Sequence, residues 1–209
     1  TGDGGHGIMA TQGGTATLTN VTFTTSGAHS APVATDRGGG TITSTGDKIT
    51  VSGTDSPCYY STGSLTITDA VCNSTGSESV VIEGANSVIL DNSSLTSGIE
   101  DKWGVMIYQS FSGDAEGTNG VFTMTGGSLS HTATNGPLFY VTNTTGNITL
   151  KNVDVKAASG SQQRVRAGLD FRKQGVQVED GLETGEEEPL RDRLQTRADG
   201  GVGEAGCGL

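Results

Sequence analysis

GSLTITDAVCNSTG, residues 63–76, contains one copy of the pattern that decides how this chain folds. In it, the apolar residues Leu65 and Ile67 are separated by one residue, Asp69 follows, and Cys72 continues the apolar series. The same order of residue types returns six times within residues 1–160. The copies begin at Ala16, Ile42, Leu65, Val88, Phe122 and Ile148. A short pattern that returns along a chain predicts a stack of similar coils.

The spacing of the copies predicts the kind of coil. The second apolar position of each copy holds Leu18, Ser44, Ile67, Leu90, Met124 and Leu150, at intervals of 26, 23, 23, 34 and 26 residues. Apolar and polar residues alternate within each copy, as in a half-buried strand. A further apolar stretch, such as Val33-Ala34, precedes each copy and supplies a third strand per coil. The sequence therefore predicts an all-β, right-handed parallel β-helix of about six coils.

One position in every copy carries a residue suited to a turn. It holds Asn20, Gly46, Asp69, Asn92, Gly126 and Asn152. These residue types tolerate a left-handed backbone or hydrogen-bond their own turn. We expect such a turn to redirect the chain so that the next apolar residue faces inward again. Ser44 departs from the apolar pattern, and its hydroxyl is expected to bond the backbone unless that coil is distorted.

The 34-residue interval contains about ten extra residues of loop-forming type, centred on residues 112–120. Loops on a rigid scaffold often carry binding residues. The candidates here are Asp114, Glu116, Thr118 and Asn119. Length variation without a function is the alternative.

A threonine ladder is the second candidate site. Outward positions between the paired apolar residues hold Thr17, Thr43, Thr66, Thr123 and Thr149, with Ile89 interrupting the series. A flat array of threonines can order water and bind ice, although threonine is also an ordinary exposed strand residue. Ice binding is therefore a remote alternative function.

Composition excludes several classes of function. The net charge is −11, and residues 1–160 carry five basic side chains, which disfavours nucleic-acid binding. No apolar stretch approaches the roughly 18 residues of a membrane helix, so this segment is not expected to insert into a membrane. The three Cys lack a Cys-x-x-Cys pair and the three His are far apart, which argues against a zinc site. Cys72 is expected to pack as a core residue. A Cys58–Cys72 bridge stays open, because spacing alone does not establish one.

The composition changes abruptly after Gly160. Residues 161–209 contain no Asn and lose the turn position of the repeat. We therefore expect two parts: a β-helix over residues 1–160, forming a piece of a longer solenoid, and a charged, Gly-rich tail over residues 161–209. The tail is expected to be disordered or weakly helical, or to come from a shifted reading frame.

Residues 13–27, 63–76, 122–130 and 139–157 resemble right-handed parallel β-helix repeat proteins of the pectin-lyase-like superfamily. The Gly- and Thr-rich coils are similar to bacterial surface or secreted repeat proteins of adhesin type. This resemblance implies export to the cell surface or the extracellular space. It also implies a non-catalytic structural or adhesive stalk that binds glycans or host and cell-surface proteins. Candidate sugar contacts are Tyr59, Tyr60, Trp103, Tyr108 and Phe111, most of which are expected to pack under turns.

A carbohydrate-active enzyme is the competing function, because the superfamily contains pectate lyases and polygalacturonases. Such enzymes need carboxylates clustered across neighbouring coils, with Ca²⁺ and Arg in the lyases or with His in the hydrolases. Gly5-His6-Gly7 resembles the Gly-His-Gly of the hydrolases, but their Asn-Thr-Asp and Asp-Asp elements have no counterpart. Asp69 and Asp91 do not occupy equivalent positions. We therefore expect no catalytic residue and no cofactor. Calcium binding by acidic turns stays open, without a nonapeptide repeat to support it.

Overall fold

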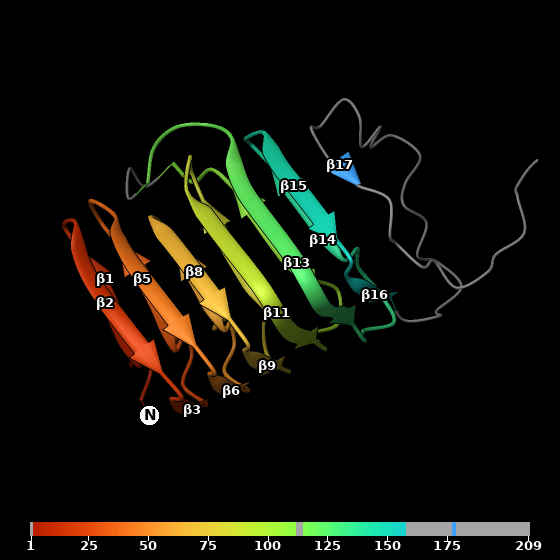
Figure 1. Ribbon diagram of the computed structural model, residues 1–209, viewed down its shortest axis with the longest axis horizontal. Helices are drawn as coiled ribbons and strands as arrows, with labels where there is room; N and C mark the ends of the chain where they lie inside the picture. Colours follow the sequence, from red (N-terminus) through yellow and green to blue (C-terminus); the bar gives the residue numbers. More distant parts are fainter. Residues whose placement is uncertain (1, 112–114, 158–176, 179–209) are drawn as a thin grey trace, which may run out of the picture.

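The computed structural model describes residues 2–111, 115–157 and 177–178. These residues form an all-β parallel solenoid of about six coils, in which strands from successive coils lie side by side (Figure 1). The predicted fold class is confirmed. The predicted tail, residues 161–209, lies outside the described residues except for the two-residue strand β17. Residue 114 of the predicted binding loop also lies outside them.

The first sheet is formed by the strand that opens each coil. Its order is β1 (Ile8–Thr11), β4 (Val33–Asp36), β7 (Tyr59–Ser61), β10 (Val80–Glu83), β12 (Val105–Tyr108) and β14 (Phe139–Thr142). Neighbouring strands are parallel and in register. They correspond to the apolar stretch that precedes each copy of the pattern in the sequence and supplies the predicted third strand of a coil.

The second sheet has two arms. The long arm contains β2 (Gly14–Thr19), β5 (Gly40–Thr45), β8 (Ser64–Thr68), β11 (Ser87–Ser97), β13 (Gly120–His131) and β15 (Gly146–Lys151), with β17 (Gln177–Val178) paired to β15. The short arm contains β3 (Thr22–Thr25), β6 (Lys48–Val51), β9 (Val71–Ser74) and β16 (Asp154–Ala157). The long strands β11 and β13 run through both arms and join them.

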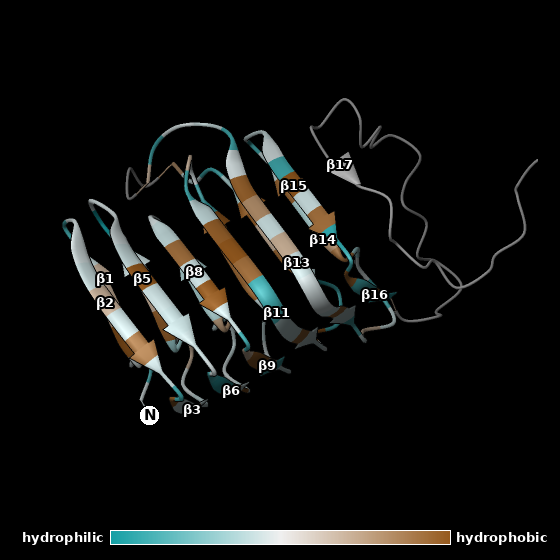
Figure 2. Cartoon of the chain, in the orientation of Figure 1, coloured by the Kyte–Doolittle hydropathy of each residue, from teal (hydrophilic) through white to brown (hydrophobic). Residues whose placement is uncertain are grey.

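The strand register confirms that equivalent residues of successive coils lie against one another. Leu18 pairs with Ser44, which pairs with Ile67 in the next coil. The file continues through Leu90 and Met124 to Leu150. Apolar residues recur as brown bands along β8, β11, β13 and β15 (Figure 2). Each buried aliphatic or aromatic side chain in such a file contributes about 1.5–3 kcal/mol to folding.

The predicted left-handed turn is present in every coil. The backbone angle φ is 54° at Asn20, 75° at Gly46, 54° at Asp69, 46° at Asn92, 67° at Gly126 and 54° at Asn152. The turn side chains also contact each other, because Asn92 Nδ2 donates to Asp69 Oδ1 at 2.6 Å. This position turns each coil between the long arm and the short arm.

Two interior features bear on the expectations: the partner of Ser44 differs from the predicted one, and the cysteine bridge that the sequence left open is formed. Ser44, fully buried, donates its hydroxyl to the carboxylate of buried Asp47, whereas the sequence predicted a backbone acceptor. The pairing of β5 with both neighbours continues through Ser44, so the coil is not distorted there. Cys58 and Cys72 form a disulfide inside one coil, and both cysteines are buried, as expected for Cys72.

Candidate functional site

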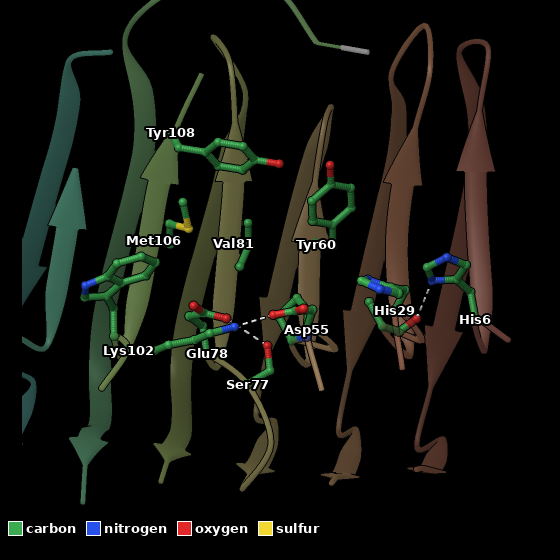
Figure 3. Close-up of a pocket in the computed structure, with 13 residues that line it drawn as sticks. His6, His29, Asp55, Tyr60, Ser77, Glu78, Val81, Lys102, Met106 and Tyr108 are labelled. Carbon is green, nitrogen blue, oxygen red and sulfur yellow. Dashed lines mark hydrogen bonds and ion pairs between the residues drawn. The ribbon is translucent and has the colours of Figure 1, made fainter. Parts of the chain in front are cut away.

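A groove of about 510 Å³ lies over the outer face of the first sheet and the turns that lead into it (Figure 3). Its lining comes from five successive coils, so the groove runs across the strands, along the direction in which coils stack. The coils contribute His6, then His29 and Ala31, then Asp55, Pro57 and Tyr60, then Ser77, Glu78 and Val81, and finally Lys102, Trp103, Met106 and Tyr108. Because coils stack at about 4.8 Å, five coils offer room for a linear ligand.

The strand alternation explains the floor of the groove. Tyr59, Val80 and Val105 point inward and are fully buried. The residue after each of them points outward, and the parallel register places these residues side by side as Tyr60, Val81 and Met106. An apolar floor with aromatic edges is typical of a small-molecule or sugar site.

A buried carboxylate holds two aromatic rings of the groove in place. Glu83, 1% exposed, accepts hydrogen bonds from the hydroxyl of Tyr60 in the preceding coil and from those of Tyr108 and Ser110 in the following coil. The Tyr108 hydroxyl lies 2.9 Å from Glu83 Oε2. Burial and the bond to Glu83 raise the pKa of Tyr60 well above its ordinary value, so its hydroxyl remains a donor. Both rings are therefore fixed before any ligand arrives.

A second aromatic element lies at the far end of the groove. Trp103 stacks on Tyr140 with ring centroids 3.9 Å apart and an interplanar angle of 4°. Trp103 belongs to the turn before β12 and Tyr140 to β14, so the stack joins two coils. Because Trp103 also lines the groove, this pair forms a rigid aromatic wall.

Charged side chains gather beside the rings. Lys102 forms an ion pair with Asp55, and Glu78 lines the same groove. Glu78 is 4% exposed and accepts a hydrogen bond from Ser77 Oγ at 2.8 Å. Asp55 precedes β7 by four residues and Glu78 precedes β10 by two, so they are not equivalent positions of the repeat. Sequence comparison of the coils therefore missed that two carboxylates of neighbouring coils share one groove.

Three of the five predicted sugar-contacting aromatic residues line the groove, namely Tyr60, Trp103 and Tyr108. Tyr59 is fully buried in the core instead. Phe111 is 95% exposed and does not line the groove. His6, from the Gly5-His6-Gly7 stretch, also lines the groove, and its Nδ1 lies 3.0 Å from the Ala31 carbonyl oxygen.

The predicted binding loop is separate from the groove. Glu116, Thr118 and Asn119 are exposed and none of them lines the groove. The loop is tied to the body by Gln109 Nε2, which donates to the Ala115 carbonyl at 2.5 Å, and by the backbone bond from Ala85 to Glu116. Asp114 lies outside the described residues. A binding role for this loop stays a prediction.

The threonine ladder lies on another face of the solenoid. The register places Thr17, Thr43, Thr66, Thr123 and Thr149 in one file on the outer side of the long arm, with Ile89 between Thr66 and Thr123. The register thus brings these residues together, but ice binding stays a prediction.

Within the described ranges, no group of three or more His, Cys, Asp or Glu side chains is arranged to hold a metal ion. Those ranges also contain no helix long and apolar enough to cross a membrane. Comparison with known proteins finds no matching family model, no similar curated protein and no similar solved structure.

Proposed function

We propose that this protein is a non-catalytic, adhesive β-solenoid stalk that binds glycans through the groove on its first sheet. The observation that carries the proposal is the combination of pre-set rings and polar groups in one axial groove. Tyr60, Tyr108 and Trp103 offer ring faces and edges for sugar rings. Asp55, Glu78 and Lys102 offer acceptors and donors for sugar hydroxyls.

The proposed location is the bacterial cell surface or the extracellular space. The disulfide between Cys58 and Cys72 supports it, because disulfides persist in oxidising compartments and are rare in the cytosol. The three-strand coils and the resemblance of residues 13–27 and 63–76 support membership of the pectin-lyase-like superfamily. Host or cell-surface proteins remain alternative partners.

A glycan-array screen followed by titration of the best oligosaccharide tests the proposal. Trp103→Ala removes one aromatic wall and is expected to weaken binding about tenfold. Phe111→Ala is the matched control, because Phe111 is an exposed aromatic residue outside the groove lining. Equal binding by both variants, or the absence of any glycan ligand, contradicts the proposal.

A polysaccharide-cleaving enzyme is the second candidate, and one observation favours it. Asp55 and Glu78 come from neighbouring coils and line the same groove, and an acid–base mechanism needs two carboxyl groups in one site. Assays on polyuronates with Ca²⁺ and on neutral polysaccharides separate the two functions. Cleavage that disappears in both Asp55→Asn and Glu78→Gln overturns the non-catalytic proposal.

A further inference from the structure

We infer that the groove selects glycans with free amino groups, such as polymers of deacetylated amino sugars, and that Glu78 and Asp55 receive the ammonium groups. This inference rests on the proposed glycan-binding function and names its ligand class. It excludes polyuronates, which carry the opposite charge.

The charge balance of the groove supports a cationic ligand. Among the Asp, Glu, Lys and Arg residues that line it, Asp55 and Glu78 carry carboxylates and Lys102 carries an ammonium group. The electrostatic field around the groove is also negative, since residues 1–160 contain 13 acidic and five basic side chains. Such a field attracts cations and repels a polyuronate.

Glu78 is the residue that points to a ligand. Glu78 is 4% exposed as a residue but still lines the groove, so it lies at the base of the site. Ser77 Oγ is its hydrogen-bond donor among the described residues, whereas a carboxylate can accept about four hydrogen bonds. Lys102 pairs with Asp55 instead. A buried carboxylate with a single donor gains from a charged partner that enters the groove.

The aromatic residues suit the same ligand. Trp103 and Tyr60 line the groove with Glu78. An ammonium group is attracted to an aromatic ring face as well as to a carboxylate, and a sugar ring packs on the same surfaces. A neutral sugar would use the ring faces but leave Glu78 with its single donor.

The sheet geometry favours a glycan over a basic peptide. Inner strands of the first sheet such as β7, β10 and β12 hydrogen-bond to a neighbour on each side. The groove lies over the face of these strands, so a bound extended peptide finds no free strand edge with which to pair its backbone. A glycan has no such backbone requirement, because its hydroxyl and amino groups bond to side chains.

The test titrates the full chain with three oligosaccharides of equal length, made of glucosamine, N-acetylglucosamine or galacturonate. We expect glucosamine to bind about tenfold more tightly than N-acetylglucosamine, with an advantage that shrinks at high salt. Binding of N-acetylglucosamine at least as tight as that of glucosamine, or tightest binding of galacturonate, overturns this inference and leaves the proposed function standing. No binding to any oligosaccharide overturns the proposed function itself.

Variants that change the charge of the groove test whether the preference for glucosamine arises there. Glu78→Gln should weaken glucosamine binding about tenfold and change N-acetylglucosamine binding by less than about twofold. Lys102→Gln should tighten glucosamine binding, because it removes a cation and releases Asp55. Asp91→Asn is the control, since Asp91 is an exposed acid on the long arm, outside the groove lining.

Two further measurements separate ligand selectivity from a loss of stability and from peptide binding. If Glu78→Gln lowers the melting temperature, the exposed Asp55→Asn takes its place, with the same expected loss. A lysine oligopeptide of equal charge is titrated in parallel. Tighter binding of that peptide than of the glucosamine oligomer overturns the assignment to a glycan.

Discussion

At the scale of single residues, the turn between the two arms depends on a left-handed backbone. Asn92 has φ of 46° and its amide bonds to Asp69. Asn92→Val forces a β-branched residue into this conformation and is expected to cost about 1–2 kcal/mol of unfolding free energy. Asn92→Gly also loses the amide bond but tolerates the conformation, so it is the matched control. Urea unfolding that shows equal losses for both variants contradicts the backbone explanation.

The Ser44–Asp47 pair is a polar interruption of an apolar column. Ser44→Ala removes a hydroxyl donor from the buried Asp47 carboxylate, and we expect a loss of about 1–3 kcal/mol. The double change Ser44→Leu with Asp47→Ala should restore or exceed the original stability, because Leu90 and Ala70 fill the corresponding positions elsewhere. A double variant less stable than Ser44→Ala in urea unfolding contradicts this explanation.

His131 makes the stability depend on pH. It is fully buried at the end of β13, with Nδ1 2.8 Å from Ser97 Oγ. Burial lowers its pKa below the ordinary 6.5, although the negative charges of Glu100 and Glu78 act in the opposite direction.

As the pH falls, His131 therefore binds a proton more readily in the unfolded chain than in the native state. Stability from neutral His131 is fully present above about pH 6.5 and decreases as the pH falls from there toward the lowered native pKa. Unfolding free energies measured between pH 7.5 and 5 should fall with pH, and His131→Gln should reduce the slope. An unchanged slope in the variant contradicts this role.

At the scale of elements, the disulfide fastens the turn before β7 to β9 within one coil. It spans 14 residues, and closing a loop of that size contributes about 3 kcal/mol by restricting the unfolded chain. Cys58→Ala with Cys72→Ala should lose about this amount. A reducing agent should destabilise the original chain and leave the double variant unchanged. Equal stability with and without the reducing agent contradicts the contribution of the bridge.

Most strands of the fold are predictable from the sequence because the pattern is local. Apolar alternation and one turn residue per copy define the long and short arms, and the register confirms Leu18, Ile67 and Leu90 in one file. The partner of Ser44 was predicted wrongly, because Asp47 sits at a turn and its direction depends on the coil as a whole.

The candidate site was predictable only in part. Tyr60, Trp103 and Tyr108, chosen as sugar-contacting candidates from residue type, all line the groove, and their contact with a sugar stays a prediction. The sequence did not predict that these aromatic residues share a groove with Asp55 and Glu78. Turns of different length place the two acids at non-equivalent positions of the repeat. Only the stacking of folded coils brings them into one groove.

At the scale of the whole molecule, the faces of the solenoid are distinct. The first sheet carries the groove, and the long arm carries the threonine ladder. The loop belongs to the connection between β12 and β13 (Figure 1). Each coil contacts its neighbours only, so a ligand that spans several coils is expected to stiffen those coils without changing the rest. The position of ligand-induced protection therefore distinguishes the faces.

Hydrogen exchange of the full chain, measured with and without a saturating oligosaccharide, tests the groove assignment most directly. Added protection should appear in β7, β10 and β12 and in the turns that carry Asp55, Glu78 and Trp103. Protection confined to the threonine ladder on the long arm, or to residues 115–119 of the loop, would contradict the assignment of the groove as the glycan-binding surface.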